Sequence, residues 1–119
     1  PAGPAGPVAS AAPAAWAPDD PAFEAAVLRA FVKNGRVASI PARERKKLVV
    51  WRYLTDQVFP DPAEELHERD VNMRLALRHP DVASLRRYLV DDGYMERGGG
   101  IYRLLPEERW PSPETIAGD

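Results

Sequence analysis

Apolar residues recur at helical spacing in four segments of the chain, and the residues at the segment ends indicate where each helix begins and stops. The first helix is predicted over residues 21–33. Asp20-Pro21 suits an N-cap followed by a first turn, and Asn34-Gly35 is a stop signal. The apolar positions that recur in this segment are Phe23, Val27, Ala30 and Phe31.

A second and a third helix follow a short alternating run. Residues 36–40 are predicted as a strand, and Pro41 opens a helix that stops before Pro60, because a residue before proline is driven out of the α region. The apolar stripe of this second helix is Leu48, Val50, Trp51, Leu54 and Val58. A third helix is predicted over residues 66–78, beginning at Leu66, with Val71, Met73 and Leu75 facing inward.

The last predicted elements are a helix and a hairpin. Asp81 can cap a fourth helix over residues 82–91, and Gly93 is suited to end it. Three glycines then separate two short strand candidates, residues 94–97 and 101–104. A helix–turn–helix followed by a hairpin predicts a mainly α, α+β domain of the winged-helix or helix–turn–helix type.

Composition divides the 119 residues into three parts. Residues 1–20 are rich in Ala and Pro and predict an extended linker, in which Trp16 is the one large apolar side chain. Residues 21–105 form the predicted domain, and residues 106–119 a flexible tail. The chain begins with Pro rather than Met, and we interpret it as a fragment of a longer protein.

Cysteine is absent, which excludes a disulfide scaffold, a thiol nucleophile and a thiolate-ligated metal. Neither a membrane span nor a basic signal-peptide region stands out, so the expected location is the cytoplasm with no membrane partner. The net charge of −2 hides an asymmetry. Residues 29–103 carry 15 basic and 11 acidic residues, a net charge of +4, whereas the flanks sum to −6.

Two stretches, residues 35–54 and 70–103, resemble an uncharacterised bacterial family known only as a domain of unknown function. The most specific motifs are Ser39-Ile40-Pro41, the Lys/Arg run, Val71-Asn72, His79-Pro80-Asp81 and Leu85-Arg86-Arg87. Its members stand free or lie C-terminal to arsenical-repressor-type winged-helix transcriptional regulators. The resemblance implies a regulator module but supplies no activity. The third helix of the family usually follows a Thr or Ser cap, where this chain has His67.

Two basic clusters are the candidate binding residues. The first lies in the opening turns of the second helix and comprises Arg43, Arg45, Lys46 and Lys47. Because a helix N-terminus disfavours cations, helix stability does not explain this cluster. It is interpreted either as a phosphate contact or as a solvated face whose long stems cover apolar surface.

The second cluster surrounds the predicted helix–turn–helix and wing, and comprises Arg78, Ser84, Arg86, Arg87, Arg97 and Arg103. In that fold the first turns of the fourth helix reach base edges, and the glycine turn touches phosphate. The alternative is a scaffold for protein pairing, with these arginines in weak surface ion pairs.

No carboxylate pair, phosphate-binding loop or nucleophile elbow is present, so we expect no catalytic residue, cofactor or metal. Asn72 is interpreted as a hydrogen-bonding core residue. The leading hypothesis is a non-enzymatic module of a transcriptional regulator that contacts DNA. The alternative is a dimerisation or effector-sensing module, paired with an upstream winged-helix domain or a second copy. An effector pocket would lie among Trp51, Tyr53, Tyr88 and Tyr94.

Overall fold

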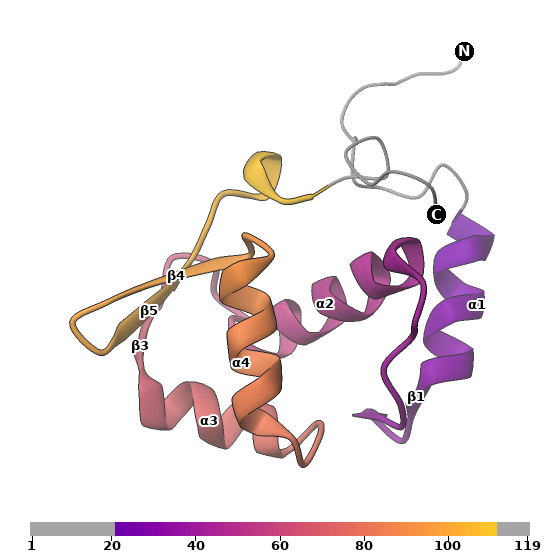
Figure 1. The fold of residues 1–119 in the computed structure, drawn as a ribbon, viewed down its shortest axis with the longest axis horizontal. Coiled ribbons are helices and arrows are strands. Elements are labelled where there is room, and N and C mark those ends of the chain that lie inside the picture. The colour runs from indigo at the N-terminus through magenta and orange to yellow at the C-terminus, as the bar shows by residue number, and fades with distance from the viewer. Residues whose placement is uncertain (1–20, 112–119) are drawn as a thin grey trace.

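The computed structural model describes residues 21–111, which form four helices, two small antiparallel sheets and a final 3₁₀ turn (Figure 1). The expected linker over residues 1–20, including Trp16 and Asp20, lies outside the described residues, as do residues 112–119. The elements are α1 (Pro21–Phe31), β1 (Val32–Lys33), β2 (Arg36–Val37), α2 (Glu44–Val58), β3 (Glu65–His67), α3 (Glu68–Ala76), α4 (Val82–Asp91), β4 (Met95–Gly98), β5 (Ile101–Leu104) and η1 (Glu107–Arg109).

The core is built around α2, which crosses the middle of the molecule in Figure 1. Every residue of its predicted apolar stripe is buried, and Val50, Leu54 and Val58 have no exposed surface. No helix within residues 21–111 combines the length and the apolar character needed to cross a bilayer. The α2 helix begins at Glu44 rather than at Pro41 as predicted, because Arg43 is still extended, with φ −80° and ψ 136°.

The first helix is shorter than predicted, because the Asn34-Gly35 signal makes a hairpin turn instead of a helix C-cap. The α1 helix ends at Phe31, and Val32 pairs with Val37 across the turn. Asn34 and Gly35 have φ values of 54° and 78°, as a two-residue hairpin turn of the I′ type requires. The strand predicted over residues 36–40 is reduced to Arg36–Val37.

The predicted start of the third helix was wrong, because residues 65–67 form a strand. β3 pairs antiparallel with β5, so that Leu66 lies opposite Tyr102, and the sheet order is β3-β5-β4. Both residues of that pair are buried, at 4% and 1% exposure. The α3 helix therefore spans residues 68–76, and His67 precedes it without a side-chain cap. Met73 was expected to face inward but is 59% exposed.

The α4 helix has the predicted bounds, residues 82–91. The side chain of Asp81 accepts a hydrogen bond from the backbone N–H of Ser84 at 3.4 Å, as the predicted cap. Gly93 follows with φ 89°, and the hairpin of β4 and β5 begins two residues later. Figure 1 shows the hairpin projecting away from α4, on the side of the molecule opposite α1.

The folded structure continues past residue 105, where the sequence predicts the tail to begin. Trp110 is only 8% exposed and packs on Tyr94 with ring centroids 5.1 Å apart. Arg52 lies over the Trp110 ring at 5.2 Å and hydrogen-bonds to Glu107. The η1 turn is thus attached to the core by an aromatic and an ionic contact.

Candidate nucleic-acid interface

The helix α4 and the hairpin enclose a surface cavity of about 220 Å³ in which basic side chains gather. Three arginines of the second predicted cluster line it, namely Arg86, Arg87 and Arg97. Asp91 is the one acidic residue among its lining side chains. Arg97 of β4 thus joins Arg86 and Arg87 of α4, which lie 11 and 10 positions earlier in the sequence, in one positively charged depression.

Arg86 is held in this cavity by the neighbouring helix. Its Nη1 donates a hydrogen bond to Oδ1 of Asn72, which lies on α3. A hydrogen bond with one charged partner is stronger than a neutral one, and it fixes the guanidinium relative to both helices. Asn72 was interpreted as a hydrogen-bonding core residue; it is half-buried and orients a candidate binding residue.

The side chains of Arg87 and Arg97 form no hydrogen bond or ion pair with any other residue of the described chain, residues 21–111. Both are exposed, one on α4 and the other on β4. Because no carboxylate neutralises them, both charges remain available to an anion arriving from solvent. Asp91 weakens the local positive potential but pairs with neither arginine.

The floor of the cavity is formed by Tyr102 of β5, whose hydroxyl donates to Oε1 of Glu68 at 2.9 Å. Burial raises the pKa of Tyr102, and the hydrogen bond to Glu68 raises it further. Tyr102 therefore stays neutral and ties the hairpin to the start of α3. The backbone N–H of Glu68 adds a bond to the carbonyl of Gly100 at 3.2 Å, which fixes the base of the glycine turn.

The remaining predicted members of the second cluster have other neighbours. Ser84 lies in the first turn of α4, where its backbone N–H meets the Asp81 cap. Arg103 forms ion pairs with Glu65 at 2.8 Å and Glu96 at 3.9 Å, so it links the three strands of the sheet. The hydrogen bond to Glu65 raises the pKa of Arg103.

Arg78 joins the end of α3 to the first hairpin. Its NH1 donates to the carbonyl of Gly35 at 3.0 Å, and Tyr53 donates to the same carbonyl at 2.7 Å. The positive φ of Gly35 favours glycine there, and a Cβ at this position would lie 2.9 Å from the Arg78 guanidinium and displace it. These contacts give Arg78 a structural role away from the cavity.

The first cluster covers the contact between α1 and α2. Arg45 lies over the ring of Phe23 at 5.7 Å, and Lys46 over that of Phe31 at 5.9 Å. Lys47 pairs with Glu44 at 3.0 Å. Arg43 is the exposed residue that precedes α2. These contacts favour the interpretation of this cluster as a face whose long side chains cover apolar surface.

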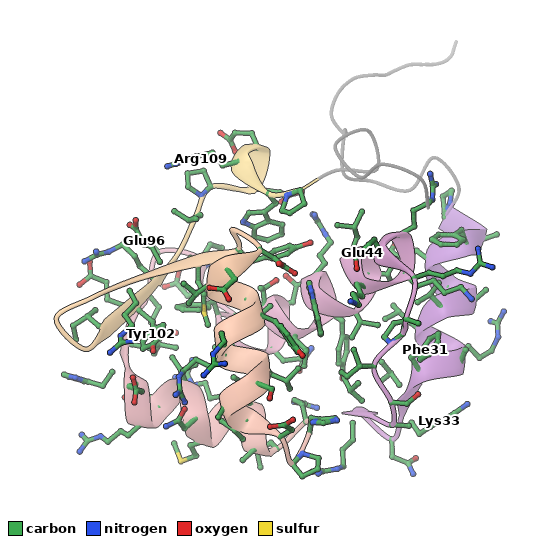
Figure 2. The ribbon with its side chains drawn as sticks, viewed as in Figure 1. Phe31, Lys33, Glu44, Glu96, Tyr102 and Arg109 are labelled. Atoms are coloured by element: carbon green, nitrogen blue, oxygen red, sulfur yellow. The ribbon has the colours of Figure 1, made fainter. Side chains whose placement is uncertain are left out.

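The two clusters lie at opposite ends of the molecule. Figure 2 shows Phe31, beside the first cluster, on the α1 side and Tyr102, in the cavity, on the hairpin side. The two clusters line different cavities. The structure brings together Arg86, Arg87 and Arg97 in the cavity between α4 and the hairpin. It gathers three residues of the first cluster, with Phe23, around a separate cavity of about 340 Å³, namely Arg43, Arg45 and Lys46.

The chain belongs to a bacterial family described as an uncharacterised protein conserved in bacteria (DUF2087), whose profile matches residues 36–104. That match covers β2 to β5, which includes the arginine-lined cavity. Searches of curated proteins and of solved structures gave no match.

Sequence reasoning missed the contacts that organise the cavity. Neither the Asn72–Arg86 bond nor the Tyr102–Glu68 bond is visible as a motif, because each joins residues on different elements. One signal was available: Glu65-Leu66-His67 alternates polar and apolar residues, as an exposed-edge strand does.

Proposed function

We propose that residues 36–104 form a winged-helix module of a bacterial transcriptional regulator, which contacts DNA and catalyses no reaction. The order helix, strand, helix, turn, helix, hairpin supports this assignment. In that geometry α4 enters the major groove, and the turn at Gly99-Gly100 approaches the backbone. Such a module would act in the cytoplasm, either free-standing or joined to an upstream DNA-binding domain or to a second copy.

The observation that carries the proposal is the convergence of Arg86, Arg87 and Arg97 on one cavity between α4 and the hairpin. Phosphate contacts supply most of the affinity of DNA-binding proteins, and unpaired arginines on a groove-facing helix and a wing are suited to that role. The held side chain of Arg86 would keep one fixed contact, while the other two adapt to the backbone.

Binding to a fluorescein-labelled random duplex, followed by anisotropy at low and at moderate salt, tests the proposal. We expect Arg87→Ala with Arg97→Ala to weaken binding by about tenfold or more at low salt. The matched control is Arg29→Ala with Arg43→Ala, which removes the same charge from exposed positions at the α1 end. Absence of binding at low salt, or equal losses in the two double variants, would reject DNA contact at this cavity.

A second candidate function is protein pairing through the outer face of α3. Met73 and Leu77 lie one helical turn apart, at the end of that helix, and are 59% and 62% exposed. Sedimentation equilibrium separates the two functions, because a pairing module associates without DNA. Association that Leu77→Lys abolishes would favour pairing, whereas a monomer at all accessible concentrations would reject it.

A further inference from the structure

A separate cavity of about 220 Å³ lies where the first half of α2 meets the residues that follow α4. Leu48 and Trp51 of α2 and Tyr94 beside the hairpin give it apolar walls, and Glu44, Lys47 and Asp92 give it charge. None of these residues belongs to the arginine-lined cavity. No residue of α4 lines this cavity, whereas α4 supplies most of the lining of the other one, and no part of the proposed DNA contact uses this cavity.

The aromatic walls are buried and packed against other rings. Trp51 is 2% exposed and stacks on Tyr88 with ring centroids 5.7 Å apart and planes at 22°. Tyr94 is 1% exposed and packs on Trp110. The Tyr94 hydroxyl is buried and has no hydrogen-bond partner within the described residues. Buried polar atoms are nearly always paired in cores, so this wall is not a fully satisfied packing surface.

Asp92 is the carboxylate of the cavity that has no direct ion pair within the described residues. Lys47 lies 3.0 Å from Glu44, so these two neutralise each other. Oδ2 of Asp92 accepts a hydrogen bond from Nε1 of Trp51 at 2.9 Å, and no described Lys or Arg lies within ion-pair distance of it. Burial raises the pKa of Asp92 and the nearby Glu44 raises it further, whereas the Trp51 hydrogen bond and the charge of Lys47 lower it.

We propose that this cavity binds a small aromatic ammonium compound, with its cationic group on Asp92 and its ring against Trp51, Leu48 and Tyr94. A cation beside an indole and a carboxylate gains both a cation–π contact and a charge pair. The cavity volume of about 220 Å³ lies below the range of about 300–1,000 Å³ that is usual for drug-sized ligands, and therefore limits the ligand to a small one, such as an organic cation with one ring. An inorganic cation would make no use of the aromatic walls, and an anion would be repelled by the carboxylate of Asp92. The proposal is independent of DNA binding.

Benzylammonium chloride is the probe, and the indole N–H resonance of Trp51 in ¹⁵N-labelled protein is the reporter. We expect a saturable shift with a dissociation constant on the order of 1 mM, typical for a ligand of this size. Benzoate has the same ring and the opposite charge, and we expect it to bind at least tenfold more weakly. A shift that does not saturate, or equal shifts with the two compounds, would overturn the proposal.

Asp92→Asn removes the charge, keeps an acceptor for Trp51, and is expected to weaken benzylammonium binding by about fivefold or more. Asp91→Asn is the control, because Asp91 is the neighbouring acid and does not line this cavity; its effect should stay below about twofold. Equal losses in the two variants would contradict the site.

A second readout needs no variant. Bound ammonium favours the charged form of Asp92, so the pKa of the Asp92 carboxyl group should fall on saturation with benzylammonium. The chemical shift of the carboxyl carbon, measured against pH, reports this pKa. An unchanged Asp92 titration in saturated protein would overturn the proposal. All of these measurements are made without DNA, so their outcome is separate from that of the anisotropy experiment.

Discussion

Asn72 on α3 accepts a hydrogen bond from the guanidinium of Arg86 on α4, across the turn that joins the two helices. The bond lets Asn72 orient Arg86, which is one of the residues proposed to bind DNA. It also explains why Asn, which favours caps and turns, stands in the middle of a nine-residue helix. A polar side chain there costs little helix stability when it orients a charge on the next helix.

Replacing Asn72 by Ala should loosen α3 from α4. The lost bond joins a neutral acceptor to a charged donor, so we expect the free energy of unfolding in urea to fall by about 1–2 kcal/mol. Asn72→Asp is the matched control, because it restores an acceptor for Arg86 and should recover most of the loss. A stability equal to wild type in Asn72→Ala would show that the bond contributes nothing.

The glycine turn of the hairpin offers a test of backbone strain. Gly100 has φ 79° and open space around a would-be Cβ, so Gly100→Ala should destabilise the protein by about 1 kcal/mol through its backbone alone. Gly98→Ala is the control, since Gly98 has equally open space and no positive φ, and we expect no loss there. Thermal unfolding of both variants, followed by circular dichroism, measures the difference; equal midpoints would contradict the turn geometry.

Trp110 should be a large contributor to stability although it follows the predicted domain. Truncating a buried Trp that packs on Tyr94 should cost about 3 kcal/mol, measured by urea unfolding of Trp110→Ala. Arg109→Ala changes the exposed neighbouring residue and should change stability by less than about 0.5 kcal/mol. A small effect at position 110 would mean that η1 is not attached to the core.

Asp92 predicts a pH dependence with a definite sign. Its pKa is raised above the ordinary 3.8 by burial and by Glu44 and Asp91, against the effects of Trp51 and Lys47. The folded state therefore binds the proton more tightly, and stability falls as pH rises from 3.8 through the raised value. Urea unfolding from about pH 3 to pH 6 should show this fall for wild type relative to Asp92→Asn. A difference that grows in favour of wild type over that range would reverse the sign.

Elements with local signals could be predicted from the sequence. The α4 helix has its predicted bounds because Asp81, the apolar face of Leu85 and Leu89, and Gly93 all act within a few residues. The stripe of α2 was likewise correct, because 3.6-residue periodicity follows from burial of one face.

Elements that depend on partners distant in the sequence could not be predicted. β3 exists because Leu66 pairs with Tyr102, 36 positions away, and no local pattern in three residues specifies that pairing. Asn34-Gly35 fits a helix stop and a hairpin turn equally well, and the pairing of Val32 with Val37 decides between them.

The candidate site followed the same division. Sequence reasoning selected Arg86, Arg87 and Arg97 from their places on a predicted helix and wing, and the structure brings these three together. The sequence also grouped Arg78 and Arg103 with these three, and the structure gives both of them other partners. Arg78 donates to the carbonyl of Gly35 and Arg103 pairs with Glu65. These partners come close only in the folded chain.

The salt dependence of DNA binding tests the central claim most directly. Each phosphate contact contributes about 0.9 to the slope of log affinity against log salt concentration. Anisotropy titrations over a salt series should therefore give a slope that is smaller in magnitude by about 1.8 in Arg87→Ala with Arg97→Ala than in wild type. The Arg29→Ala with Arg43→Ala variant should keep the wild-type slope. An unchanged slope in the first variant, or the same decrease in both, would contradict DNA contact through the cavity between α4 and the hairpin.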